Sequence, residues 1–304
     1  MFMLEIDKKN GSVAFNDQSH TYFNLEDDSI KYVSVTTMIE KFGQPFAKEF
    51  WSAYKALEKI LPKDEWAIEK KSLLNTKKFD MDILEAHNID IDTFNKEQQA
   101  ILDTWQEENK KSCERGTKIH ANLENSMYKK KNNIDLTKFQ VGGKFECIKD
   151  NTELDLENGV YPEYLISWDS PSGKLHVAGQ IDLIAKQGNC ITILDWKTNK
   201  KIDTKGFFDS KTHKTEKMKF PLGSLDECNY SHYCLQLSTY AYMLTQKHPE
   251  FIIDDLVLVH FDHNDNMTVY HLPYLRDEVI HMLTFYEKQV VLDTRKAKNK
   301  PIEY

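Results

Sequence analysis

The stretch GQIDLIAKQGNCITILDWKTNK, residues 179–200, predicts a β-hairpin. Two runs rich in apolar and β-branched residues, 177–185 and 190–198, have the composition and length of strands. Gly188 and Asn189 stand between the runs and give the signal of a two-residue hairpin turn. The two strands are therefore expected to pair antiparallel through this turn.

Charged residues occur at facing positions of this predicted hairpin. With Gly188-Asn189 as the turn, paired positions sum to 377, so Asp182 lies opposite Asp195. Lys197 follows two residues later and shares their face. The other face is expected to carry Ile191, Ile193 and Trp196. Like charges at facing positions are destabilising unless something binds there. A divalent cation would resolve the conflict, and an exposed face with a chance ion pair is the alternative.

Length and composition limit the fold and the partners. A chain of 304 residues, 40% hydrophobic and 29% charged, has room for one large domain with insertions or for two smaller ones. The first residues show no signal-peptide pattern and no apolar run has the length of a membrane span, so we expect a cytoplasmic protein without a membrane partner. A net charge of −8 disfavours a protein that binds nucleic acid nonspecifically over its whole surface, although it says little about the charge of a single cleft.

The pattern of apolar residues changes from helical to extended along the chain. Residues 12–34 alternate like short strands, and 46–131 carry apolar positions mostly at helical spacing. The second half predicts strands and helices at 161–168, 175–185, 190–198, 230–246, 256–261, 268–272 and 274–292. With a helix around His120, the order is α, β, β, β, α, β. The predicted divisions are 1–111, with strands and helices, a core at 112–293 and a basic tail at 294–304.

Three further stretches contain polar residues that could contact a ligand. They are ERGTKIHANLE at 114–124 with His120, VYPEYLISWD at 160–169 with Glu163, and YCLQLSTYAYML at 233–244 with Gln236 and Tyr240. The last two residues are four apart and share one helical face. Each stretch alone also fits an ordinary structural role: a surface or core histidine, a strand-end charge, or a packed helix with a boundary hydrogen bond.

Together, these residues resemble the signature of the PD-(D/E)XK nucleases and of their RecB-like exonuclease branch. Asp182, followed after a twelve-residue gap by Asp195-Trp-Lys197, matches the core signature. Three motifs match the branch, in its order: GxxxH ending at His120, GxxD ending at Asp182, and QxxxY from Gln236 to Tyr240. The resemblance covers roughly residues 112–272. Residues 32–37 and the helices after them look like the N-terminal region of phage-encoded and mitochondrial genome maintenance members.

The resemblance implies a fold and a set of site residues. The fold class is α/β (α+β), a restriction-endonuclease-like αβββαβ core with a mostly helical N-terminal half, in which 1–111 guides DNA. The implied metal ligands are His120, Asp182, Asp195 and the backbone carbonyl of Trp196. The implied catalytic residues are Asp182, Asp195, Lys197 and Glu163, the last as an accessory carboxylate. Residues expected to contact DNA are Gln236, Tyr240, Arg115, Thr117 and Lys200, of which Gln236 and Tyr240 could instead brace the lysine.

The implied cofactor is one or two Mg²⁺ or Mn²⁺ ions, for which carboxylates are suitable oxygen ligands. An iron–sulfur cluster is not expected. Relatives that hold one use an upstream cysteine and a closely spaced downstream group, whereas the cysteines here end at Cys228 and Cys234. The five cysteines form no CxxC pair, which also disfavours a disulfide framework and a zinc knuckle. The chain has no GxxxxGK[ST] P-loop, so it resembles a stand-alone nuclease.

The function implied is a metal-dependent DNA exonuclease that acts on single-stranded ends in replication, recombination or repair. Such a protein would be phage-encoded, located in the host cytoplasm, and able to work with replication or recombination proteins. One alternative is a structure-selective endonuclease that cuts flaps or junctions. An alternative of another class is a non-catalytic nucleic-acid-binding protein with a relic site.

Overall fold

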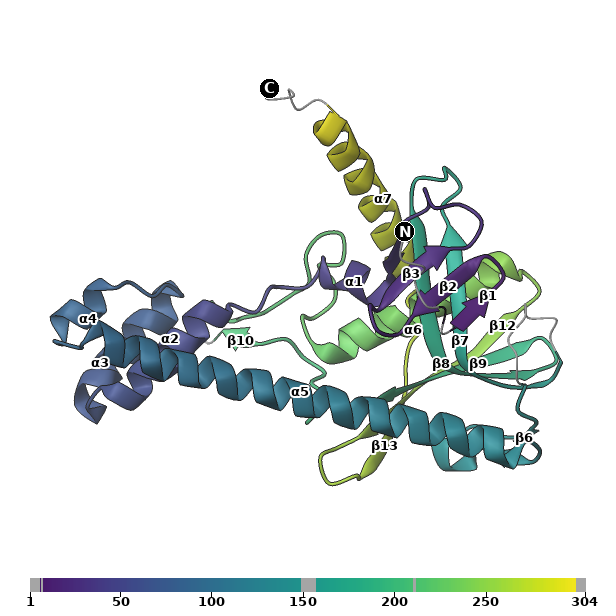
Figure 1. Cartoon of the computed structure of the whole chain (residues 1–304), viewed down its shortest axis with the longest axis horizontal. Helices are drawn as coiled ribbons and strands as arrows, with labels where there is room; N and C mark the ends of the chain where they lie inside the picture. The colour runs from purple at the N-terminus through teal and green to yellow at the C-terminus, as the bar shows by residue number, and fades with distance from the viewer. Residues whose placement is uncertain (1–5, 7, 149–156, 210–211, 299–304) are drawn as a thin grey trace. The chain divides into compact units, whose positions relative to one another are not determined.

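The computed structural model describes residues 6, 8–148, 157–209 and 212–298 (Figure 1). The chain is a mixed α+β protein, as predicted. It divides into two compact units, one formed by Met1–Gln44 with Lys118–Tyr304 and one by Pro45–Thr117. We call them the sheet unit and the helical unit. No helix in the part of the chain described is both long enough and apolar enough to cross a membrane.

The sheet unit is built around six strands. They are β4 (Tyr32–Ser34), β7 (Gly159–Asp169), β8 (His176–Gln187), β9 (Cys190–Lys197), β12 (Ile252–Phe261) and β13 (Met267–His271). The order is β13-β12-β9-β8-β4, with β7 also paired to β8. β8 is antiparallel to β7 and β9, whereas β12 runs parallel to β9. The sheet is therefore mixed. Because β9 and β12 are parallel neighbours, the chain between them has to cross over.

The order of the main elements is the predicted one. His120 lies on α5 (Ile91–Lys130), and β7, β8, β9, α6 (Asn229–Lys247) and β12 follow along the chain. The αβββαβ order is confirmed. Short elements interrupt the path from α5 to β7: β5 (Ile134–Asp135), the 3₁₀ turn η1 (Thr137–Phe139) and β6 (Lys144–Phe145). The loop between β9 and α6 holds the short hairpin of β10 (Phe208–Asp209) and β11 (Lys214–Thr215).

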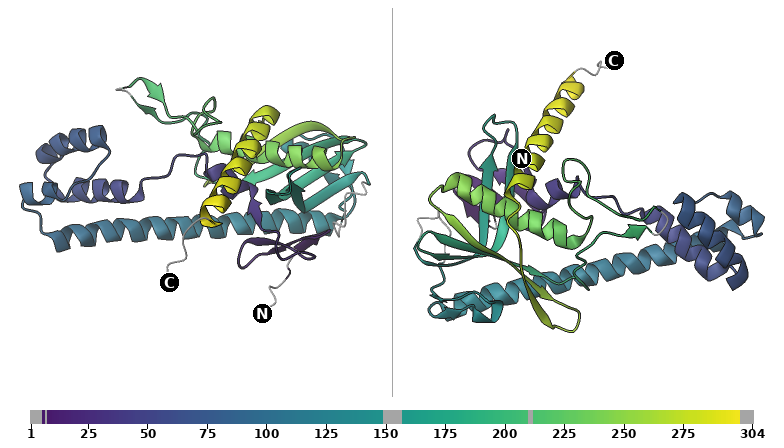
Figure 2. Two further views of the ribbon diagram at one scale, coloured as in Figure 1. Left: turned by 90° about the horizontal axis from the view of Figure 1, so that it is seen from above. Right: turned by 180° about the vertical axis from the view of Figure 1, so that it is seen from behind.

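Apolar residues cover both faces of the sheet. One core joins the sheet to α1 (Val35–Glu40), α6 and α7 (Arg276–Lys298). The opposite core joins Met127 on the last turns of α5 to Leu194 and Trp196 of β9. Figure 2 shows the sheet between α6 and the end of α5. The Ser34 hydroxyl caps α1, since it accepts a hydrogen bond from the Thr37 amide at 3.0 Å.

One edge of β8 is shared by two strands. β7 pairs with β8 from Asp169↔His176 to Gly159↔Lys186 and so occupies one edge along its length. The other edge pairs with β4 at residues 176–178 and with β9 at 183–187. Within the described residues, 179–182 of β8 pair with neither of these two strands. The predicted GxxD motif thus lies where β4 and β9 separate.

A small N-terminal sheet lies against β7. It consists of β1 (Lys8–Asn10), β2 (Val13–Asn16) and β3 (Thr21–Asn24), in that order. The buried Asn10 side chain donates a hydrogen bond to the Leu165 carbonyl at 2.7 Å. Val13 and Phe15 form a small apolar core with Leu165. The first strands of the chain therefore belong to the sheet unit.

The helical unit contains α2 (Lys48–Ile60), α3 (Lys63–Thr76), α4 (Asp82–Ala86) and the first part of α5. Its core includes Phe50, Tyr54, Leu57, Trp66 and Phe94. After α4, the His87 ring contacts two carboxylates of α3, Glu65 at 2.5 Å and Glu69 at 3.1 Å.

The observed units differ from the division predicted at residue 111. That division groups the first strands with the helices, whereas here they join the sheet. Residue 111 itself lies inside α5, which runs without interruption to Lys130. The predicted basic tail at 294–304 begins within α7, and residues 299–304 lie outside the described part of the chain. The roles predicted for these parts stay predictions.

Candidate active site

The central hairpin has the predicted register. β8 and β9 pair from Gln187↔Cys190 to Leu183↔Leu194, all at positions that sum to 377. Asp182 and Asp195 come directly after the last of these pairs. There the Asp182 side chain takes the place of a backbone acceptor of the β8–β9 ladder, since its Oδ2 accepts a hydrogen bond from the Trp196 amide at 2.7 Å. The turn chemistry thus brings the two aspartates to one place.

Asp195 is almost fully buried, at 1% exposure, and both of its oxygens have polar neighbours. Oδ1 accepts a hydrogen bond from the Gln236 amide on α6 at 3.2 Å. Oδ2 lies 2.6 Å from the Lys197 ammonium, although it accepts no hydrogen bond of ordinary geometry among the described residues. Burial alone would lower the pKa of Lys197, but the charges of Asp195 and Asp182 outweigh it and raise that pKa. Lys197 is therefore held in its charged form.

The faces of β9 differ from the prediction. Ile191 and Ile193 lie in the core against α6, the helix from which Gln236 reaches Asp195. Trp196 lies in the opposite core, with its ring 4.9 Å from that of Phe139. The prediction for the two isoleucines was wrong, because side chains alternate along a strand and positions 191, 193 and 195 point the same way.

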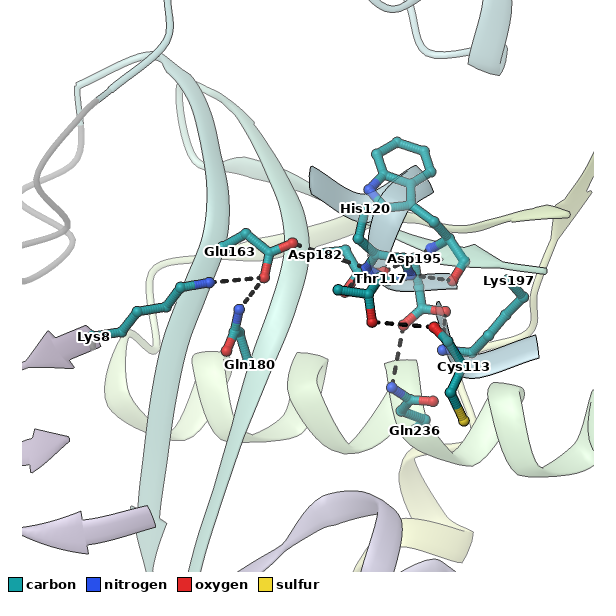
Figure 3. A network of polar contacts seen from close by, with 11 residues as sticks. Lys8, Cys113, Thr117, His120, Glu163, Gln180, Asp182, Asp195, Lys197 and Gln236 are labelled. Carbon is teal, nitrogen blue, oxygen red and sulfur yellow. Dashed lines mark hydrogen bonds and ion pairs between the residues drawn. The ribbon is translucent and has the colours of Figure 1, made fainter. Parts of the chain in front are cut away.

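A second group of ligand atoms meets beside Asp182. His120 Nδ1 lies 3.6 Å from Asp182 Oδ1 and 3.9 Å from Glu163 Oε1 (Figure 3). The three side chains offer ligand atoms within 4.8 Å of one another. Two atoms that each lie about 2.1 Å from one ion are at most about 4.2 Å apart. Both separations from His120 are shorter than this limit, so the histidine could share a divalent cation with either carboxylate.

His120 is oriented by a backbone carbonyl. Its Nε2 lies 3.0 Å from the Trp196 oxygen, and a carbonyl can only accept, so Nε2 carries the hydrogen. In the neutral ring the lone pair is then on Nδ1, the atom that faces the two carboxylates. Histidines that bind metals commonly donate the other ring N–H to such a partner. The Trp196 carbonyl has a second lone pair, so its predicted role as a ligand stays a prediction.

Glu163 has an unusual backbone conformation for a residue in the middle of a strand. Its φ of +52° lies in the left-handed region, which costs a non-glycine residue about 1 kcal/mol. The β7–β8 ladder lacks the Glu163–Asp182 pair, although it continues on both sides with Pro162↔Leu183 and Tyr164↔Ile181. Strained residues of this kind concentrate at functional sites.

The carboxylates of the site repel one another. Burial and the charge of Asp195 raise the pKa of Asp182 well above its usual range. Burial and the charge of Glu163 likewise raise the pKa of Glu124, one turn after His120 on α5. A bound cation would lower these pKa values, because it favours the ionised carboxylates. The donor set of imidazole and carboxylates suits Mn²⁺ as well as Mg²⁺.

Gln236 and Tyr240 are both buried, at 8% and 3% exposure. Gln236 Nε2 lies 3.4 Å from the Tyr240 hydroxyl besides its contact with Asp195. The Tyr240 ring lies against the backbone of Gly179, where an added Cβ would be 2.5 Å from a ring carbon. These residues support Asp195 and β8, and a contact of either with DNA stays a prediction.

Three other residues are predicted to contact DNA. Arg115 and Thr117 belong to the helical unit, and the Thr117 hydroxyl donates to the Cys113 carbonyl of its own helix at 3.1 Å. Lys200 is exposed in the loop after β9. Their roles stay predictions. The sequence reading missed Lys8 and Gln180, both of which contact Glu163 Oε2. No local motif marks either residue.

Comparisons with known proteins add little to this geometry. No protein-family model matches the chain, and no curated protein matches it. A crystal structure of a "putative exonuclease" from Eubacterium rectale is similar at a TM-score of 0.34, with 13% identity over 90% of each chain. The crystal structure of SSO0001 gives a TM-score of 0.31 and 16% identity, and the similarity spans 62% of each chain. TM-scores this low carry no functional argument, so function must be argued from the site.

Proposed function

We propose that this protein is a divalent-metal-dependent deoxyribonuclease that hydrolyses DNA phosphodiester bonds, acting as an exonuclease on single-stranded ends. One observation supports it above the others. His120, Glu163 and Asp182 have ligand atoms within 4.8 Å of one another, and the buried Asp195 with its partner Lys197 lies on the same hairpin as Asp182. The predicted PD-(D/E)XK signature includes Asp182, Asp195 and Lys197 of this set, and His120 ends the GxxxH motif of the RecB-like branch.

Each residue has a task in this proposal. His120, Glu163 and Asp182 would hold a divalent cation, with Asp195 as the further ligand that the signature predicts. A cation bound there supplies Lewis-acid stabilisation of phosphate charge and lowers the pKa of water. Lys197 is held charged by Asp195, so it is suited to stabilise negative charge that develops on the phosphate rather than to act as a base.

The buried support of Asp195 is consistent with these tasks. Gln236 donates to one oxygen and leaves the other to the Lys197 ammonium. This arrangement fixes the carboxylate before substrate arrives, which is the condition for efficient electrostatic catalysis. The preference for single-stranded ends rests on the resemblance to RecB-like exonucleases and is the finer part of the proposal.

The test uses end-labelled linear and circular single-stranded DNA, incubated with the full chain and Mg²⁺, Mn²⁺ or EDTA. We expect the linear strand to be degraded with either metal, the circle to persist, and EDTA to stop the reaction. Asp195→Asn should abolish cleavage. The matched control is Asp169→Asn, which changes an aspartate at the end of β7 that contacts His176.

The outcomes separate the alternatives. Rapid cutting of the circle would replace the exonuclease by an endonuclease, and branched substrates would then identify a preference for flaps or junctions. Binding of DNA without cleavage in any metal would support the non-catalytic protein with a relic site. Equal activity of Asp195→Asn and Asp169→Asn would place the chemistry elsewhere.

A further inference from the structure

We infer that Lys8, on the first strand of the protein, is a positioning residue for Glu163. Together with Gln180 it holds one oxygen of the Glu163 carboxylate, so that the other oxygen serves as a single ligand atom for the cation. The inference rests on the proposed cation site and adds to it a residue 155 positions away in the sequence.

The two oxygens of Glu163 have different surroundings (Figure 3). Oε2 lies 3.2 Å from Lys8 Nζ and also accepts a hydrogen bond from the Gln180 amide. Oε1 lies 3.9 Å from His120 Nδ1, on the side of Asp182. The contacts on Oε2 therefore leave Oε1 turned toward the other ligand atoms and disfavour bidentate binding of a cation by Glu163.

The position of Lys8 is fixed by the strand that carries it. Asn10, two residues later on β1, donates to the Leu165 carbonyl, two residues later on β7. Both contacts have the same sequence offset of 155, so β1 follows β7 in a defined register. Burial and the charge of Glu163 also raise the pKa of Tyr22 on β3, a second residue of the N-terminal sheet near this carboxylate. Lys8 thus reaches Glu163 from a supported strand and not from a loose terminus.

Glu163 needs such support. Its left-handed φ is unfavourable for a residue with a side chain, so the conformation persists where the surroundings impose it. The side chain is only 11% exposed, and Asp182 and Glu124 add negative charge near it. The positive charge of Lys8 counteracts this negative charge. It also lowers the pKa of Glu124, which burial and the charge of Glu163 raise.

An ordinary surface ion pair would have a different effect. Lys8 is 28% exposed, and exposed pairs typically contribute little. Loss of a positive charge that merely lay near the site would leave cation binding unchanged or strengthen it, because the carboxylates would become more negative. Loss of a positioning residue weakens it, typically by 10- to 100-fold for partners of metal ligands. The sign of the change distinguishes the two roles.

The experiment measures Mn²⁺ binding by the full chain, from the paramagnetic resonance signal of free Mn²⁺, without DNA. Lys8→Met should weaken binding about tenfold. The matched control is Lys9→Met, which removes the same charge from the next, exposed position of β1. Lys8→Arg should recover most of the affinity, because it restores a cationic donor. Melting temperatures of all variants verify that the sheet unit is folded.

A double variant tests whether Lys8 acts through Glu163. Glu163→Gln alone should weaken Mn²⁺ binding, and Lys8→Met should add nothing further in that background. Unchanged or tighter binding by Lys8→Met, or an equal loss in the Glu163→Gln background, would overturn the inference. Wild-type protein that binds Mn²⁺ and degrades DNA while Lys8→Met binds it normally would refute only the role of Lys8. Wild-type protein that binds no Mn²⁺ would refute the cation site as well.

Discussion

Replacing Gly179 by alanine should destabilise the sheet unit through Tyr240. A Cβ at Gly179 would lie 2.5 Å from Tyr240 Cε1, closer than real carbon contacts allow, while its backbone φ is outside the left-handed region. Tyr240 is a buried residue of α6, and its ring must move for the methyl group to fit. The change therefore tests packing at the GxxD motif without adding backbone strain.

Two opposing effects set the size of the change. Overpacking costs about 1–3 kcal/mol, and glycine to alanine at a compatible backbone stabilises by about 0.4–1 kcal/mol through the unfolded chain, so the net loss should be about 0–2.6 kcal/mol. For a unit of this size, that corresponds to a fall in melting temperature of up to roughly 10 °C. Urea unfolding and calorimetry on the full chain measure both quantities.

The control and the partner variant make the result interpretable. At Gly142 an added Cβ meets nothing within 4 Å, so Gly142→Ala should be neutral or slightly stabilising. Gly179→Ala should cost less when Tyr240→Leu has removed the ring atoms that clash, which gives a measurable coupling between the two positions. An effect of Gly179→Ala that is additive with that of Tyr240→Leu would refute the contact described here.

Three further predictions concern the site and the helical unit. Asp195→Asn and Lys197→Met should each reduce cleavage more than 100-fold, the upper range for partners of metal ligands, yet keep DNA binding in gel-shift assays; near wild-type turnover of either would remove the hairpin from the active site. Mn²⁺ should support cleavage at least as well as Mg²⁺ and Ca²⁺ should support binding alone, and His120→Ala should shrink the manganese advantage; unchanged metal curves would show that His120 is merely packed. Contacts with Glu69 and Glu65 raise the pKa of His87 above the unfolded value of about 6.5, so its stabilisation is complete below that pH and is lost as pH rises through the folded pKa. Urea unfolding across pH 6–8 should show this loss, and His87→Gln, which removes the one histidine of residues 45–117, should flatten it; an equal slope in the variant would contradict it.

The sequence was most informative where the decisive interactions are local. The hairpin register follows from a two-residue turn and strand alternation, so the meeting of Asp182 and Asp195 could be predicted. The helix that carries His120 and the strand that carries Glu163 could be predicted from periodicity, and the family signature indicated that they converge. The error on the face of Ile191 and Ile193 could have been avoided, because alternation along the strand already puts positions 191, 193 and 195 on one face.

Other features depend on contacts that no local pattern encodes. The Lys8–Glu163 contact joins residues 155 positions apart, and a single lysine in a short strand gives no signal of it. The left-handed conformation of Glu163 cannot be read from the sequence either, because a glutamate in a strand pattern gives no signal of a left-handed φ and the surrounding structure imposes it. α5 runs without interruption across the division predicted at residue 111, which agrees with the helical spacing of apolar residues over 46–131.

The distance along the chain between β1 and β7 has a consequence for synthesis. Lys8 leaves the ribosome 155 residues before Glu163, which at 5–20 residues per second is a wait of roughly 8–30 s. Residues 45–117 lie between them and contain mainly local helical contacts, which form much faster than that. The N-terminal strands must therefore wait for β7 while the helices complete, and a nascent chain that stops before β7 lacks Glu163 and Leu165, which Lys8 and Asn10 contact. Slowing translation between these segments should expose the first strands to proteases for longer without affecting the helices.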